Sequence, residues 1–240
     1  MIIPAPPAPS TPWPLPRIKL HIEDLDHEGA AIFQGAVNAR DALHLAVQAS
    51  YRWLYTVDNP PPKVTQILLV LRSMPGVAHT IGTGRDGMEK EIHFSLEYIV
   101  HSKARATAEI MGVLVHETVH CYQHNGKNTC PGGLIEGIAD YVRLREGYAP
   151  PHWKRRGEGA QWDAGYDTTG YFLAWIEDTY GAGTVSKLNH CMKNKSYHKR
   201  HFKDLTKCSV KKLWNAYCCL LKDDDGAKVL EILSARDDDD

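Results

Sequence analysis

Five consecutive residues in the middle of the chain have the spacing of a metal site. His116, Glu117 and His120 form the pattern His-Glu-x-x-His. On a helix, histidines four residues apart lie one turn from each other on the same face, so both imidazoles can bind one Zn²⁺. Glu117 lies about 100° around the helix from His116, where its carboxylate can reach a water molecule on the metal without being a ligand.

The residues around this pattern help to distinguish a metal site from a chance match. Five residues can match by chance, and the alternative is an amphipathic helix with two surface histidines. Residues 113–115 and Val119 are aliphatic, however, which indicates a buried helix. A metal ion would offset the cost of burying imidazoles and a carboxylate there.

The third ligand has several candidates. His124 lies about 12 Å along the helix axis from His116, too far for both to bind one ion comfortably. Gly126 stands where the longer pattern HExxHxxGxxH would need a histidine. Glu136 follows a turn rich in glycine and proline that could fold a second helix back on the first, and we predict it as the ligand. Asp140, one turn further on, would accept the remaining ring N–H of His116. The alternative for both carboxylates is a solvated acidic stripe.

The segment HETVHCYQHNG, residues 116–126, and the segment PGGLIEGIADYVRLREGY, residues 131–148, resemble the plant basic secretory protein family. The resemblance extends through residues 153, 162–167 and 213–214, and more weakly back to about residue 18. That family is regarded as peptidase-like and similar to the gluzincin metallopeptidases.

For this chain, the resemblance implies that His116, His120 and Glu136 bind zinc, that Glu117 is the general base and that Asp140 supports a ligand. It also implies a zincin-like layout, in which a mixed sheet packs on the motif helix. Residues 92–99 would supply the edge strand that borders the cleft.

Three protein ligands leave one position of a zinc ion for water, whose pKa can fall to about 7 there. With Glu117 as general base, this water would attack an amide carbonyl, and Glu117 would return the proton to the leaving nitrogen. We predict that Tyr166 donates a hydrogen bond to the oxyanion, with Tyr171 and His152 as weaker candidates. A tyrosine packed at the start of a helix is the alternative for Tyr166.

Two other functions fit the same residues. The first is a zinc-dependent biosynthetic enzyme, a hydrolase or lyase, that acts on a small amide- or lactam-containing metabolite. The second is a zinc-binding protein without catalysis, against which the intact Glu117 argues. The expected partner is a peptide or a small-molecule amide. The sequence identifies neither the substrate nor the oligomeric state.

Composition limits the remaining possibilities. The 240 residues are 43% hydrophobic and carry 28 Lys and Arg against 29 Asp and Glu, a net charge of -1. This balance gives no long-range field for nucleic acid or an anionic membrane. We find neither a secretory signal nor a membrane-spanning segment and expect a cytoplasmic protein. The six cysteines are then expected to be thiols.

The elements that must position the site follow from hydrophobic spacing and from glycine and proline. We predict an α+β fold with one zincin-like domain at 17–222, after a proline-rich arm at 1–16 and before an acidic end at 223–240. The stretch around Gly82, Gly84 and Gly87 is predicted as a loop. The predicted strands are 18–22, 64–71 and 92–96. The predicted helices are 29–54, 102–124 with Ser102 as N-cap, 133–146, 164–180, 185–193 and 210–221.

Overall fold

A computed structural model describes residues 13–84, 86–157, 159–223 and 226–235. These residues fall into two compact units. The sheet unit comprises described residues from 13–122 and 146–150, and the helical unit comprises described residues from 123–145 and 151–235. The mixture of helices and a mixed sheet confirms the predicted α+β class.

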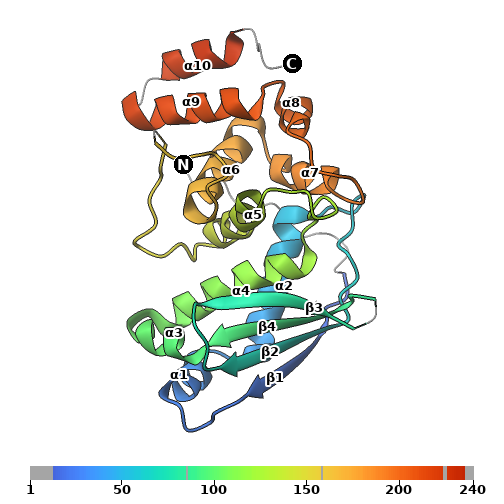
Figure 1. Ribbon diagram of the computed structural model, residues 1–240, viewed down its shortest axis with the longest axis vertical. Helices are drawn as coiled ribbons and strands as arrows, with labels where there is room; N and C mark the ends of the chain where they lie inside the picture. The colour runs from blue at the N-terminus through green and yellow to red at the C-terminus, as the bar shows by residue number, and fades with distance from the viewer. Residues whose placement is uncertain (1–12, 85, 158, 224–225, 236–240) are drawn as a thin grey trace. The chain divides into compact units, whose positions relative to one another are not determined.

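The sheet unit is built on four strands. In chain order its elements are β1 (Arg17–Ile22), α1 (Glu28–Ala36), α2 (Ala39–Leu54), β2 (Gln66–Arg72), β3 (Ala78–Thr83), β4 (Glu89–Ser95), α3 (Leu96–His101), the 3-10 turn η1 (Lys103–Arg105) and α4 (Ala106–Tyr122). The strand order is β1-β2-β4-β3 (Figure 1). β1, β2 and β4 are parallel, and β3 pairs antiparallel with β4.

One face of this sheet is the core of the unit. Ile67, Leu69 and Leu71 alternate along β2 and are fully buried, because successive side chains of a strand point to opposite faces. The pairing register places Ile92 of β4 and Thr80 of β3 on the same face as Leu69. α2 and α4 pack on each other, and α4 also packs on β3 and β4. The helix that carries the His-Glu-x-x-His pattern is therefore supported by the sheet.

The predicted edge strand is wrong. Residues 92–99 do not form one strand: their first part belongs to β4, an inner strand, and their second part begins α3. The edge strand beside β4 is β3 (Ala78–Thr83), which overlaps the predicted loop, and β1 forms the other edge of the sheet. Gly82 and Gly84 hid this strand from the sequence analysis, because glycine is rare in strands.

Two predicted helices are interrupted. The predicted helix at 29–54 breaks at Val37 and Asn38, whose backbones are extended, and the Asn38 side chain then caps α2 by accepting from the Asp41 amide. Ser102 does not cap α4. Its hydroxyl donates to the Tyr98 carbonyl at the end of α3, and α4 begins only at Ala106. Side chains that end or cap a helix overrode the hydrophobic spacing at both places.

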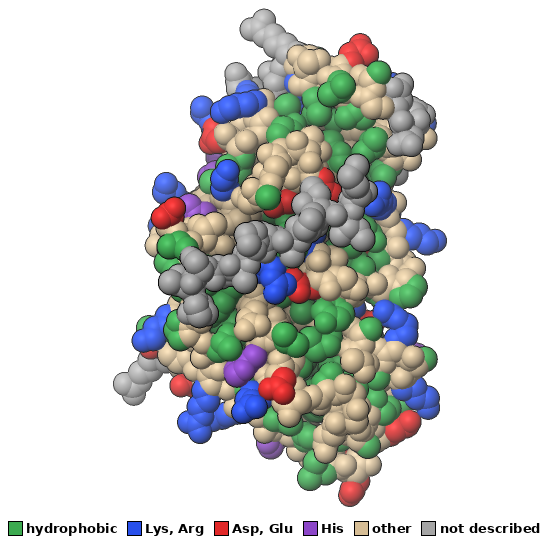
Figure 2. All heavy atoms as spheres, turned by 180° about the vertical axis from the view of Figure 1, so that it is seen from behind, with side chains coloured by type: hydrophobic (Ala, Val, Ile, Leu, Met, Phe, Trp, Pro, Cys, Tyr) green, Lys and Arg blue, Asp and Glu red, His purple; other side chains and the backbone are tan. Residues whose placement is uncertain are grey.

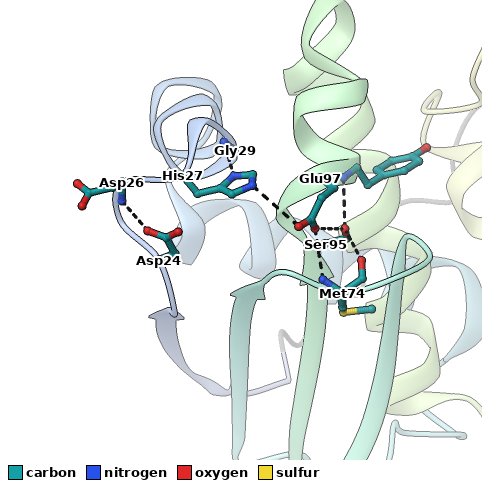
Figure 3. Close-up of polar contacts among 8 residues, drawn as sticks. Asp24, Asp26, His27, Gly29, Met74, Ser95 and Glu97 are labelled. Carbon is teal, nitrogen blue, oxygen red and sulfur yellow. Dashed lines mark hydrogen bonds and ion pairs between the residues drawn. The ribbon is translucent and has the colours of Figure 1, made fainter.

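The Glu97 carboxylate holds the junction of β4 and α3 in place (Figure 3). Ser95 is the N-cap of α3, and its hydroxyl donates to the Met74 carbonyl. The Glu97 carboxylate accepts from the Met74 amide, and it lies 4.0 Å from the His27 ring that caps α1. Hydrogen bonds, first that from Ser73, lower the pKa of Glu97 to about 2. The network joins the start of α1, the segment after β2 and the junction of β4 with α3.

The helical unit contains the remaining elements. They are α5 (Gly132–Arg145), α6 (Tyr166–Tyr180), α7 (Thr184–Cys191), α8 (Arg200–Thr206), α9 (Val210–Asp223) and α10 (Gly226–Ser234). The sequence predicted α5, α6, α7 and α9 to within two residues at every end, but not α8 and α10. The acidic residues 237–240 and most of the proline-rich arm lie outside the described residues. Within the described chain, no helix has both the length and the apolar character required to cross a membrane.

Candidate metal centre

Helix α4 places the two motif histidines side by side. The Nε2 atoms of His116 and His120 are 3.1 Å apart, and the rings meet edge to face with centroids 4.8 Å apart. Two nitrogens on one tetrahedral zinc ion, each at about 2.05 Å, lie about 3.3 Å apart. His116 is 8% exposed. The pair therefore has the separation that two ligands of one ion need.

Glu117 is buried beside this pair, at 5% exposure. The hydroxyl of Thr80, on the edge strand β3, lies 2.7 Å from Glu117 Oε2 and 3.0 Å from the Glu117 carbonyl oxygen. A hydroxyl has one hydrogen, so its strongest bond goes to the nearer and charged acceptor. The edge strand thus holds the carboxylate in a fixed direction. Thr80 could not be recognised as a site residue from the sequence, because it lies in the stretch that was predicted as a loop.

Glu136 and Asp140 lie on α5, within the helical unit. Asp140 is 2% exposed. α5 packs on α6 at unusually short range: a Cβ at Gly137 would lie less than 3.0 Å from the Thr169 side chain, and one at Gly170 would lie 3.2 Å from Asp140 Cβ. These glycines let the two helices approach until the base of Asp140 rests on α6. The solvated stripe was the alternative for both carboxylates: it does not hold for the buried Asp140, whereas Glu136 is half-buried.

Tyr166 begins α6 next to Glu136. A Cβ on the preceding Gly165 would lie 3.8 Å from Glu136 Cβ, so the start of α6 touches the helix turn that carries Glu136. Tyr166 is 58% exposed and has a φ of 47°. A left-handed backbone is uncommon for a bulky residue and often marks a functional site. The phenol is accessible, and its role stays a prediction.

Among the described residues, the histidine and carboxylate side chains that could hold a metal ion are those of His116, His120 and Glu136. This is the predicted ligand set, and His124 is not part of it. The His124 amide donates to Asn189 Oδ1. Burial, and then Lys193 and His190, lower the pKa of His124 to about 4.

The donor set fits the expected ion. Two imidazoles and a carboxylate suit zinc and related transition metals, whereas Ca²⁺ and Mg²⁺ prefer oxygen ligands alone. The chemistry of the three side chains therefore supports a borderline-soft divalent ion.

A family described as "Peptidase of plants and bacteria" matches residues 15–217. The chain belongs to this family, the basic secretory proteins. The match includes every element from β1 to most of α9 and all the candidate site residues of this basic secretory protein. No curated protein matches it, and no solved structure matches it. The family description indicates peptidase-like activity.

Proposed function

We propose that this protein is a zinc-dependent hydrolase of the gluzincin type that cleaves amide bonds in peptides. The observation that carries the proposal is the histidine pair of α4, with Nε2 atoms 3.1 Å apart, beside a buried glutamate that the edge strand orients. Membership of a peptidase family supports the same reaction.

The proposed ligands are His116, His120 and Glu136. When bound, a zinc ion supplies a Lewis acid for the substrate carbonyl and makes water more acidic. The buried Asp140 would accept a hydrogen bond from the ring of His116 and fix its tautomer. These four residues then serve binding, and none of them transfers a proton to the substrate.

The proton transfers are assigned to Glu117. Its carboxylate would accept a proton from the attacking water and later give it to the nitrogen of the cleaved amide, which balances the hydrolysis. The Thr80 hydroxyl occupies one carboxylate oxygen, Oε2, and leaves Oε1 for the water. Tyr166, which is exposed, would donate its phenol hydrogen to the carbonyl oxygen as negative charge develops there.

The test combines metal content with hydrolysis. Purified protein is expected to contain about one zinc per chain and to cleave unfolded protein or a mixed peptide library. His120→Ala is expected to lose the zinc, and His101→Ala, a change at an exposed histidine of α3, to keep it. Glu136→Gln is expected to weaken zinc binding, because an amide oxygen carries no charge.

Glu117→Gln separates catalysis from binding. It is expected to keep the zinc and to lose hydrolysis by a factor of about 10²–10⁴, the usual contribution of a general base. Full activity in Glu117→Gln would overturn the assignment of the base. Full zinc content in His120→Ala would overturn the metal site. Zinc binding without cleavage of any amide by the wild type would leave a binding protein and refute the proposed hydrolase.

A further inference from the structure

Lys90 of β4 is a half-buried cation on the face of the sheet that carries α4. The pairing register sets Lys90 opposite Gly82 of the edge strand β3. Gly82 follows Thr80 by two residues and therefore points to the same face of the sheet. Thr80 holds the carboxylate of Glu117 on this face, and α4 lies along β3 (Figure 1). Lys90 and the proposed general base thus lie on the same side of the sheet.

The Lys90 side chain reaches sideways to the edge of the sheet. A Cβ at Gly82 would lie 3.5 Å from the Lys90 Nζ, and Gly82 is exposed. The amine therefore lies over an exposed part of β3. Gly82 is about 7 Å along the strand from Thr80, since a strand advances about 3.4 Å per residue. A positive charge thus stands about two residues along the edge strand from the position that holds Glu117.

The surroundings of Cys121 place the same amine beside α4. Cys121 follows Glu117 by one helical turn, and its Sγ lies 3.7 Å from the Glu117 carbonyl oxygen. Burial raises the pKa of the Cys121 thiol. Of the two charged groups that act on this pKa, Lys90, which lowers it, has a larger effect than Glu117, which raises it. The amine is therefore close to the turn of α4 that follows the proposed base.

No carboxylate in the described part of the chain forms an ion pair with Lys90. Its strand neighbours Glu89 and Glu91 point to the opposite face of the sheet, where the Glu91 carboxylate lies 3.2 Å from His93 Nε2. The whole chain has a net charge of -1, and Figure 2 shows acidic and basic side chains interspersed on the face that it presents. An anion at Lys90 would therefore be attracted by this local charge and not by the chain as a whole.

A structural role alone does not explain this placement. α4 ends at Tyr122, and the carboxyl end of a helix carries a partial negative charge that a nearby cation stabilises. Such a role does not require the amine to lie over the exposed edge of the sheet. A half-buried amine has also lost part of its hydration, and a carboxylate from outside the chain would compensate for this loss.

We propose that Lys90 determines the specificity of the proposed hydrolase: its amine binds a carboxylate of the peptide, on an acidic side chain or at the free carboxyl end. This inference rests on the proposed function. An extended peptide advances by about 3.4 Å per residue, as a strand does. The carboxylate that meets Lys90 therefore lies about two residues from the cleaved bond.

Cleavage of a peptide series by the zinc-loaded protein tests the proposal. The series starts from a peptide that the wild type cleaves in a mixed library. Each position near the cleaved bond is occupied in turn by Glu or Gln, and the carboxyl end is free or amidated. The wild type is expected to favour one Glu position, or the free carboxyl end, by about tenfold in kcat/KM, because charged partners make strong hydrogen bonds. Raising the salt concentration is expected to reduce this preference.

Variants of Lys90 give the matched comparison. Lys90→Met is expected to raise KM for the acidic peptide about tenfold and to affect the neutral peptide much less. Lys90→Glu is expected to reverse the preference, so that Lys at the same peptide position is favoured over Glu. Lys90→Arg keeps the charge and is expected to keep the preference. Lys19→Met changes an exposed lysine on the opposite face of the sheet and is expected to have no effect.

Two results would overturn the role of Lys90 and leave the hydrolase intact. The first is cleavage of peptides by the wild type with no preference for a carboxylate at any position. The second is a loss in Lys90→Met that is equal for acidic and neutral peptides and comes with lower stability in urea. That result would make Lys90 a structural residue at the end of α4.

Binding decides the case in which the wild type cleaves no peptide, which refutes the hydrolase itself. Fluorescence anisotropy then compares labelled hexapeptide pools that carry one Glu or one Gln, with amidated ends, and a Gln pool with free carboxyl ends. Tighter binding of a pool with a carboxylate, lost in Lys90→Met, would establish the carboxylate site without hydrolysis. Equal binding of all pools, or none at about 1 mM peptide, would overturn Lys90 as well.

Discussion

The hydrogen bond from Thr80 to Glu117 makes a quantitative prediction. Thr80→Val keeps the size of the side chain and removes the hydroxyl, so that the Glu117 carboxylate loses a donor 2.7 Å away. Glu117 is 5% exposed, and water replaces the donor poorly there. Hydrogen bonds to charged groups contribute about 1.5–3 kcal/mol. We expect Thr80→Val to lower the free energy of unfolding by about this amount.

Urea denaturation in the presence of EDTA measures this loss without the stabilisation that a bound metal would add. Thr80→Ser is the matched control. It keeps the hydroxyl and loses one methyl group, at a cost of about 0.8 kcal/mol or less. Hydrolysis, once a substrate is known, is expected to fall in Thr80→Val and to recover in Thr80→Ser. If the valine variant is as stable as the serine variant, Thr80 does not stabilise the buried carboxylate.

Three further predictions concern the metal, the helix packing and pH. Zinc at about 100 times its dissociation constant is expected to stabilise the wild type by about 2.7 kcal/mol; thermal unfolding of His120→Ala should show no zinc effect, and an equal shift would contradict the site. Gly137→Ala, whose Cβ would overlap the Thr169 side chain, is expected to destabilise by about 1–3 kcal/mol in urea denaturation, whereas Gly132→Ala, with open space around its Cβ, is not. Because the folded-state pKa of Glu97 is lowered to about 2, its contribution to the free energy of unfolding is complete above about pH 4.5 and is lost as pH falls toward 2. Glu97→Gln is expected to remove this part of the pH dependence when unfolding is followed in an acid titration. An unchanged pH dependence in Glu97→Gln would contradict the prediction.

Four helices of the helical unit, α5, α6, α7 and α9, could be predicted because local signals mark their ends. Glycine and proline surround α5, and the predicted range 133–146 differs from Gly132–Arg145 by one residue at each end. The break between α1 and α2 has no such mark. It depends on Asn38, which caps α2 although the hydrophobic spacing continues through it. Short polar side chains fit both a helix and a cap, and only the packed structure decides between them.

In the candidate site too, contacts within one helix could be predicted from the sequence, whereas contacts between distant segments could not. The histidine pair is a property of one helix, so its spacing alone predicted that the two rings lie side by side, and their Nε2 atoms are 3.1 Å apart. Thr80 lies 37 residues before Glu117 and meets it only because β3 pairs with β4 beneath α4.

The glycines of α5 set the direction of the carboxylates that stand among them in the sequence GGLIEGIAD, residues 132–140. Gly133 and Gly137 lie on the helix face that packs on residues 163–169, where a Cβ on either would come within 3.0 Å of another atom. At about 100° per residue, Glu136 projects some 60° from Gly133 on the flank of that face, so the packing sets its direction. A side-chain end lies about 5–6 Å from the helix axis, so a rotation of about 20° moves it by about 2 Å. Metal ligands tolerate only about 0.2 Å. If Glu136 is a zinc ligand as proposed, a side chain at Gly137 that turned α5 by this amount would therefore abolish zinc binding, even in a variant that still folds.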